Sequence, residues 1–201
     1  EMTLFQVFLP TFMLLYFFQV FVIRSYVQWK RTGQNPFVFS RSGNAHDYIG
    51  FVFKIMTALS VCVIILFTFF EDIYSRYLGG MDYLVITELQ WTGAGILILA
   101  FVWTIIAQYQ MSNSWRIGID YEEKTILVDK GVFKLSRNPV FLGVLLIYMG
   151  VFFIAPNAVT FMLFVLCYFI LQIQTRLEEE YLVGIHGQDY IDYKKKVRRW
   201  I

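Results

Sequence analysis

Two groups of charged side chains near the end of the chain have the types and spacing to bind a small molecule. Arg137 precedes a pair of short apolar segments, and Glu178, Glu179 and Glu180 follow them. A guanidinium offers a fork of donors to a carboxylate or phosphate, and a carboxylate accepts hydrogen bonds from hydroxyl or amino groups. If the two segments fold back on each other, these residues predict a pocket with an arginine on one side and carboxylates on the other.

Simpler explanations of the same residues stay open. Arg137, two residues before Pro139, is also what an interfacial arginine ahead of a helix-starting proline would look like. Three adjacent carboxylates also suit a helix start in water. Successive helical residues are about 100° apart, so only one of Glu178 and Glu179 can point straight into a narrow pocket. Which of the glutamates does so is left open.

The composition indicates a membrane protein. Hydrophobic residues make up 58% of the 201 residues and charged residues 16%, whereas a soluble domain typically has about 25% charged residues. The apolar residues come in long runs, and a helix that crosses a bilayer needs about 20 of them. The net charge of +2 is too small and too scattered to indicate a nucleic-acid partner.

Five apolar runs predict an all-α, polytopic transmembrane bundle with about five spans. The first run is longer than a signal-peptide core and has no basic residues before it, so we expect it to be retained as a span. Gly93 and Gly95 in the third would allow close approach of a neighbouring helix. The predicted spans are residues 4–23, 49–70, 83–107, 141–155 and 158–174.

The last two spans form a short hairpin. Pro156 and Asn157 make a tight break between them, so their open ends bring Arg137 close to the glutamates. A charged, helical tail follows at 176–201, interrupted near 184–187. We treat residues 1–201 as a single membrane domain, with a three-span anchoring part at 1–107 and a core at 108–201 that holds the pocket.

The distribution of lysine and arginine predicts the orientation of the chain. The connections at 24–48 and 108–138 and the tail at 176–201 hold four, five and six such residues, whereas the loop at 71–82 holds one. Cytoplasmic connections carry an excess of these residues. Five spans place the three basic segments on one side, so we expect the C-terminus and the pocket to face the cytoplasm.

Cysteine and histidine give no sign of a metal centre or a disulfide. Cys62 and Cys167 both lie in apolar runs without C-x-x-C spacing, and His46 and His186 are isolated. Such cysteines are typical of small buried core residues. We therefore expect no bound metal.

The segments on either side of the hairpin carry a paired motif. It reads L-V-x-x-G-x-F, three residues, then R-x-P-x-F before the hairpin, and E-E-x-x-L-x-x-x-x-G-x-x-Y-x-x-Y after it. In this the last 75 residues or so resemble the isoprenylcysteine carboxyl methyltransferase family, a relative of the phospholipid N-methyltransferases. The matching residues are Leu127, Val128, Gly131, Phe133, Arg137, Pro139, Phe141, Gly143, Glu178, Glu179, Leu182, Gly187, Tyr190 and Tyr193.

The resemblance implies an integral membrane methyltransferase that takes its methyl group from S-adenosyl-L-methionine. It also implies a lipophilic acceptor that enters from the bilayer, such as an isoprenylcysteine-like carboxylate, a lipid amine or another small hydrophobic nucleophile. Catalytic roles would fall to Arg137, Asn138 and Glu179. The donor-binding residues would be Leu127, Val128, Gly131, Phe133, Arg137, Asn138, Pro139, Glu178, Glu179 and Tyr190.

Within that set the resemblance assigns separate tasks. Arg137 would hold the donor's carboxylate or order the loop, and Glu178 or Glu179 would bind its ribose or amino group. Gly131 would let the backbone approach the adenosine closely.

Departures from the family pattern bear on the acceptor more than on the donor. Asn138 stands where the family usually has histidine, and it cannot titrate, so it cannot act as a general base. Thr125 and Phe141 also replace a frequent histidine and a common tyrosine. Trp115 and Arg116 lie in a stretch that resembles bacterial members, and with Phe141 they are the predicted acceptor-binding residues.

Two other functions stay open. An NADPH-dependent sterol or lipid reductase would have a superficially similar R-x-P and G-x-x-Y tail, but such enzymes usually have more spans and a different acidic motif. A non-catalytic membrane protein, such as a transporter, is the other. Lys54 and Glu88 are the only ionisable residues in the first three predicted spans, and each lies near an end, so an ion path has little support.

Overall fold

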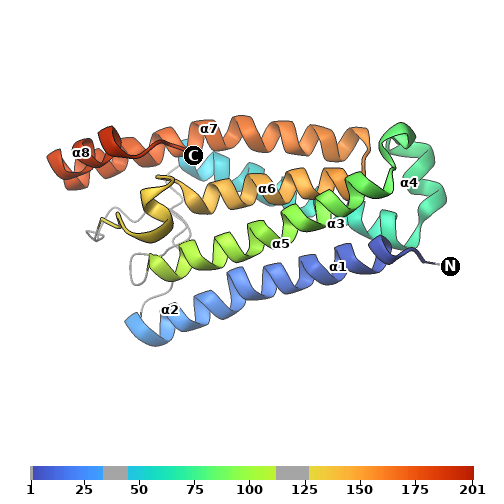
Figure 1. Ribbon diagram of the computed structural model, residues 1–201, viewed down its shortest axis with the longest axis horizontal. Coiled ribbons are helices and arrows are strands. Elements are labelled where there is room, and N and C mark those ends of the chain that lie inside the picture. The colour runs from blue at the N-terminus through green and yellow to red at the C-terminus, as the bar shows by residue number, and fades with distance from the viewer. Residues whose placement is uncertain (1, 34–44, 112–126) are drawn as a thin grey trace.

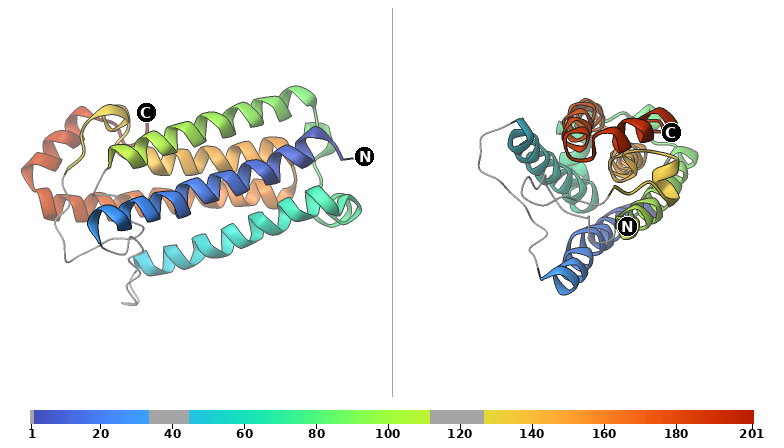
Figure 2. Two further views of the ribbon diagram at one scale, coloured as in Figure 1. Left: turned by 90° about the horizontal axis from the view of Figure 1, so that it is seen from below. Right: turned by 90° about the vertical axis from the view of Figure 1, so that its left-hand side faces the viewer.

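A computed structural model describes residues 2–33, 45–111 and 127–201. In these ranges it is an elongated bundle of helices that run roughly along one axis (Figures 1 and 2). This confirms the predicted all-α fold. In chain order the helices are α1 (Leu4–Phe17), η1 (Phe18–Ile23), α2 (Arg24–Thr32), α3 (Ala45–Phe69), α4 (Glu71–Tyr77), η2 (Asp82–Leu84), α5 (Thr87–Gln110), η4 (Gly131–Lys134), α6 (Pro139–Ile154), α7 (Ala158–His186) and α8 (Gln188–Lys196).

The lengths and composition of these helices fit an integral membrane protein. Among the described residues, four helices are long and apolar enough to cross a bilayer, and α6 is a shorter apolar helix. Large apolar side chains such as Leu14, Leu99 and Phe169 are more than half exposed, as expected where lipid covers a protein. The prediction of about five spans is confirmed. The four long helices are Leu4–Thr32, Ala45–Phe69, Thr87–Gln110 and Ala158–His186.

The first span is longer than predicted. We expected it to end at residue 23, before a polar connection, but α1, η1 and α2 form one continuous helix to Thr32. The prediction was wrong because Arg24 looks like a loop residue, whereas its side chain is only 1% exposed. The six residues of η1 form a π-helix just before it. Such a widened turn re-aims the residues that follow.

The last span is also longer than predicted. We expected a helix at 158–174, but α7 runs without a break from Ala158 to His186. Its 29 residues span about 43 Å at 1.5 Å each, which exceeds the roughly 30 Å of hydrocarbon. The turns that carry the glutamates therefore extend beyond the hydrocarbon. The predicted interruption of the tail lies at Gly187, where φ is +56°.

The turn between α6 and α7 is closed by a buried asparagine. Asn157 is fully buried and accepts hydrogen bonds from the backbone N–H groups of Val159 and Thr160, both at 2.9 Å. Its amide donates to the Ala155 carbonyl and the Tyr74 hydroxyl, both at 3.0 Å. The predicted tight break is thus confirmed. We call this end of the bundle the Asn157 end and the opposite one the Arg137 end.

Glycines let α5 and α6 pack closely near the Asn157 end. A Cβ atom added to Gly93 would lie 2.9 Å from the Gly150 carbonyl oxygen and 2.9 Å from Phe153 Cβ. The close helix approach predicted at Gly93 is therefore confirmed. At Gly95 that prediction was wrong, because nothing lies within 4 Å of an added Cβ.

The same two helices are joined at the Arg137 end. A Cβ at Gly143 would overlap Thr104 Oγ1, so the glycine of the sequence motif lets the helices meet there. The Trp103 indole N–H donates to the Pro139 carbonyl at 2.8 Å. Together these contacts fix the first turn of α6 against α5, and that turn follows directly on Arg137 and Asn138.

Candidate functional site

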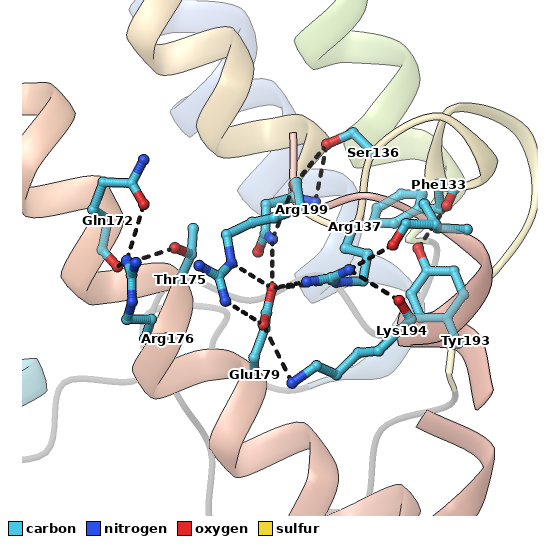
Figure 3. A network of polar contacts seen from close by, with 12 residues as sticks. Phe133, Ser136, Arg137, Gln172, Thr175, Arg176, Glu179, Tyr193, Lys194 and Arg199 are labelled. Carbon is cyan, nitrogen blue, oxygen red and sulfur yellow. Dashed lines mark hydrogen bonds and ion pairs between the residues drawn. The ribbon is translucent and has the colours of Figure 1, made fainter. Parts of the chain in front are cut away.

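Arg137 and Glu179 form an ion pair at the Arg137 end, although they are 42 residues apart in sequence. The guanidinium donates from Nε at 3.2 Å and from Nη2 at 2.9 Å to Glu179 Oε1 (Figure 3). Their side chains are only 9% and 3% exposed. The hairpin therefore brings the two predicted groups together, and Glu179 is the most deeply buried of the three glutamates.

Asn138 joins the same cluster. Its side chain is buried, and its amide nitrogen lies 3.4 Å from Glu179 Oε1 and 3.3 Å from the Arg199 carbonyl oxygen. The Asn138 backbone N–H donates to Ser136 Oγ at 3.2 Å. An amide with these partners can orient a carboxylate, but it has no proton to exchange near neutral pH.

Arg199 is the main residue of the cluster that sequence reasoning missed. It donates from Nε at 3.0 Å to Glu179 Oε1 and from Nη2 at 2.9 Å to Oε2. This is the two-point geometry that arginine forms with carboxylates. Lys194 Nζ lies 3.6 Å from Oε2. Nothing in the local sequence separates Arg199 from its neighbour Arg198, so only the long-range fold could reveal it.

The extended segment at 197–199, which we call the C-terminal strap, holds Arg199 in place. Its Arg198 carbonyl accepts from the Arg137 backbone N–H at 3.0 Å, and its Arg199 carbonyl accepts from Ser136 Oγ at 3.2 Å. Arg137 Nη1 donates to the Val197 carbonyl. The strap thus lies along the residues that precede α6.

The charges of this cluster shift the ionisation of its members. Burial on its own would raise the pKa of Glu179, but the hydrogen bonds from Arg199 and Arg137 outweigh it and lower the pKa to about 2. The bonds to Glu179 also raise the pKa of Arg199. Burial, reinforced by the charge of Glu179, raises the pKa of Glu178 to about 7. At neutral pH Glu179 is therefore ionised, whereas the surroundings of Glu178 shift its carboxyl toward the protonated form.

The other two glutamates have different surroundings. Glu178 is half-buried and makes no ion pair or hydrogen bond to any residue that the structure describes. Glu180 is exposed and borders a pocket of ≈ 250 Å³ next to the cluster. Cationic and anionic side chains meet in this pocket, which is lined by Arg176, Glu179, Glu180, Val183, Lys194 and Arg199.

The predicted adenosine-binding loop packs against α5. Gly131 has φ +60°, and the group that approaches it closely is the Gln110 side chain, which an added Cβ would overlap. Gln110 Oε1 accepts from the Val132 N–H at 2.8 Å. Phe133 is buried, and Val128 packs beside it. Leu127 is half-buried. In this structure the role of Gly131 is thus to admit a protein side chain.

Two tyrosines of α8 complete the Arg137 end. Tyr190 and Tyr193 are both buried, and their ring centroids lie 5.8 Å apart. The Tyr193 hydroxyl donates to the Phe133 carbonyl at 2.6 Å, which ties α8 to the loop before α6. Burial raises the pKa of Tyr193 to about 12 and also raises that of Tyr190.

Replacing Tyr193 with phenylalanine is expected to destabilise the fold by about 1–2 kcal/mol, because a buried carbonyl loses its donor. The matched control is Tyr190→Phe, since the Tyr190 hydroxyl makes no hydrogen bond within the described part of the chain. Removing a buried hydroxyl that has no partner should be nearly neutral or stabilising. Thermal unfolding of the purified variants in detergent measures both, and equal losses would contradict this role of Tyr193.

The predicted acceptor-binding residues are only partly visible. Phe141 packs against an apolar cluster of α3 and α7 that contains Met56, Leu163 and Leu171. Trp115 and Arg116 lie outside the described residues.

Comparison with known proteins places this arrangement in a family. The profile of a family described as "Phospholipid methyltransferase" matches residues 89–189, which is half of the chain. The chain belongs to the phospholipid methyltransferase family. The matched region begins in α5 and includes both α6 and α7, so it covers Arg137, Asn138 and Glu179.

A curated relative supports the same family. The chain is 30% identical over 109 residues to the protein-S-isoprenylcysteine O-methyltransferase of Saccharomyces cerevisiae. The alignment covers 52% of this chain and 45% of the yeast protein, so the chain spans less than half the length of that relative. The predicted methyltransferase class is confirmed at the level of the family. The reductase alternative finds no support in these two matches.

Proposed function

We propose that the chain is a membrane methyltransferase that transfers the methyl group of S-adenosyl-L-methionine to a lipophilic acceptor. The observation that carries the proposal is the buried Arg137–Glu179 pair, because it lies inside the matched family region and beside a pocket. Burying ionisable groups is costly, and clusters of buried, strongly perturbed ionisable groups are typical of functional sites.

The pocket beside Glu179 suits the amino-acid end of the donor. That end is a zwitterion, with an ammonium group and a carboxylate. Arg176 and Lys194 offer cations for the carboxylate, and Glu179 and Glu180 offer carboxylates for the ammonium group. A pocket of ≈ 250 Å³ is large enough for this part of the donor, with the rest extending toward neighbouring surfaces.

The remaining donor contacts follow from the positions of the predicted residues. Asn138 and Glu178 flank the buried pair on the α6 and α7 sides, and Tyr190 lies buried on α8. Pro139 starts α6 with the conformation that a first helical residue needs. The loop at 127–133 would contact the adenosine through Leu127, Val128 and Phe133. Gly131 would keep the backbone of this loop in position, because its lack of a side chain leaves room for Gln110.

The reaction asks for alignment more than for acid–base catalysis. The bound donor supplies an electrophilic methyl group: the acceptor's lone pair forms the new bond to carbon, and the electron pair of the broken S–C bond stays on sulfur. Holding two reactants in line contributes on the order of 7–11 kcal/mol. Asn138 cannot remove a proton, so a carboxylate acceptor, which has none to lose, fits this site better than an amine or thiol that arrives protonated.

The acceptor is proposed to be lipophilic or lipid-modified. The names of the family and of the yeast relative refer to phospholipids and to isoprenylcysteine, and both classes would reach the site from the membrane. Phe141 lies on a face of α6 that packs toward α3 and α7, and we assign it to the acceptor's apolar part. Trp115 and Arg116 stay in the same proposed role.

The site is proposed to face the cytoplasm. Lys30 and Arg31 end the first long helix, and three lysines end α8, all at the Arg137 end of the bundle (Figure 1). The connection at 71–82, at the Asn157 end, holds a single lysine or arginine, Arg76. An excess of lysine and arginine is typical of cytoplasmic segments. On this orientation the 108–201 part is the methyltransferase core and 1–107 its anchoring part.

Titration calorimetry of the purified protein with S-adenosyl-L-methionine tests the proposal. The wild type should give saturable heat. Arg137→Lys should bind about tenfold or more weakly, because lysine cannot reproduce the two-nitrogen contact that Arg137 makes with Glu179. Arg76→Lys, at the far end of the bundle, is the control and should bind as the wild type does. Binding of NADPH without binding of the methyl donor would instead favour the reductase alternative.

A transfer assay then identifies the acceptor class. Membranes incubated with donor that carries a labelled methyl group should yield label in the lipid fraction or in lipid-modified protein, and in neither when the Arg137→Lys variant is used. If Arg137→Lys and Glu179→Gln lose stability while the folded wild type neither binds the donor nor transfers its methyl group, the chain is a non-catalytic membrane protein.

A further inference from the structure

Arg137 donates four of its five side-chain N–H groups to the protein itself. The guanidinium gives Nε and Nη2 to Glu179, and it gives Nη1 to the carbonyls of Val197 and Lys194. Every nitrogen of the group is therefore engaged by the protein itself. A ligand carboxylate therefore cannot form a two-point pair with Arg137 while these bonds persist.

Glu179 is equally occupied. Its Oε1 accepts from Arg137, Asn138 and Arg199, and its Oε2 accepts from Arg199 at 2.9 Å, with Lys194 3.6 Å away. Figure 3 shows Glu179 at the centre of these contacts. A ligand's ammonium group can reach this carboxylate only if one of the protein side chains that now bonds to Glu179 moves away from it.

Among the side chains bonded to Glu179, Arg199 is the one that can move away most easily. Its side chain is 28% exposed, against 9% for Arg137, so its guanidinium regains more of its hydration when it moves out. Arg137 is also held by the carbonyls described above, whereas every side-chain bond that the structure gives Arg199 goes to Glu179. Arg199 and Glu179 both line the ≈ 250 Å³ pocket, so a molecule in that pocket meets their ion pair directly.

We propose that Arg199 is an internal competitor of the methyl donor: its guanidinium occupies on Glu179 the place of the donor's ammonium group, and donor binding displaces it. This inference rests on the proposed function and deepens it, because it names a residue that sets donor affinity. A carboxylate that is paired in the absence of ligand avoids the cost of a buried, uncompensated charge. The exchange replaces one cation by another, so the charge around Glu179 is unchanged.

Trp200 gives the strap a second anchor. It packs against the apolar cluster of Met56, Leu163, Cys167 and Leu171, in which Phe141 also takes part. The strap is thus seated by an ion pair on one side and by an indole in the apolar helix interface on the other. Loosening the indole should weaken the hold of Arg199 on Glu179 without removing the arginine.

The expected effect follows from the fraction of molecules in which Glu179 is free. The apparent Kd of a ligand equals its intrinsic Kd divided by the fraction of the competent state. If Arg199 is seated in about nine molecules of ten, its removal lowers the apparent Kd about tenfold. Trp200→Ala should lower it in the same direction by a smaller factor.

Calorimetric titration of full-length variants tests the competition. Arg199→Gln should bind S-adenosyl-L-methionine about tenfold more tightly than the wild type, and Arg199→Lys should lie between them. Arg198→Gln is the matched control, because this neighbouring side chain is exposed and only its backbone carbonyl contacts Arg137. Methylthioadenosine, which lacks the amino-acid end, should bind wild type and Arg199→Gln equally.

The outcomes separate this inference from the proposed function. Weaker or unchanged donor binding by Arg199→Gln, with a wild type that binds, overturns the competition and leaves the methyltransferase proposal standing. If Arg199→Gln does not fold, Trp200→Ala decides, and unchanged donor affinity in that variant counts against the competition. Absence of donor binding by the wild type and both variants at millimolar concentration overturns the proposed function and this inference with it.

Discussion

Replacing Glu179 with alanine is expected to lower the stability of the protein by about 3 kcal/mol and to abolish methyl transfer. Removal of one partner of a buried pair leaves the other charge uncompensated, and this typically costs about 3–5 kcal/mol. Here Arg137 is 9% exposed and would lose its only carboxylate among the described residues. The lower end of the range applies because Arg199 is 28% exposed and can turn to water.

Two measurements on Glu179→Ala separate its structural and functional effects. Thermal unfolding in detergent reports the stability, and label transfer below the unfolding temperature reports activity of the folded protein. Asp189→Ala is the control, since this carboxylate on α8 is exposed and its loss should change stability by less than about 0.5 kcal/mol. A Glu179→Ala protein as stable as this control would show that the ion pair does not hold the hairpin to the strap.

Gly93→Ala is expected to cost about 1–3 kcal/mol, whereas Gly95→Ala, two residues along the same helix, should be neutral or stabilising. A methyl group at Gly93 would lie 2.9 Å from the Gly150 carbonyl oxygen. That neighbour is backbone, so α5 and α6 must move apart, and overpacking of this kind costs about 1–3 kcal/mol. At Gly95 nothing lies within 4 Å, and alanine favours a helix over glycine by about 1 kcal/mol in water.

The pair of glycine variants provides its own control. Both changes add the same methyl group to α5, so differences in expression or detergent binding largely cancel. Thermal unfolding of the two proteins in one detergent gives the difference in stability. Equal stabilities would mean that α5 and α6 do not meet at Gly93. Because α6 begins next to Arg137, donor binding by Gly93→Ala should weaken together with its stability.

The parts of the site that could be predicted are those set by local chemistry. Arg137 and the glutamates stand at the two ends of an apolar hairpin, and an apolar hairpin has only one way to close. Glycine at 143 and proline at 139 likewise have local reasons that a motif records. The family resemblance rested on these residues, and the match over residues 89–189 confirms it.

The parts that could not be predicted depend on contacts between distant segments. Arg199 differs from Arg198 only in which way the strap turns, and no local pattern encodes that. The first span was cut short because Arg24 is charged, although the fold buries it. The Gln110 side chain, 21 positions from Gly131 in the sequence, packs against that glycine, and no local pattern announces this contact.

The unbroken course of α7 couples the proposed chemistry to the thickness of the bilayer. One rigid rod of 29 residues carries lipid-facing side chains at one end and Glu179 near the other. A thinner membrane must tilt such a rod or deform around it, and any tilt moves the carboxylate relative to Arg137, which lies just before α6. We therefore expect the lipid composition around the protein, which sets the membrane thickness, to change the geometry of the Arg137–Glu179 ion pair.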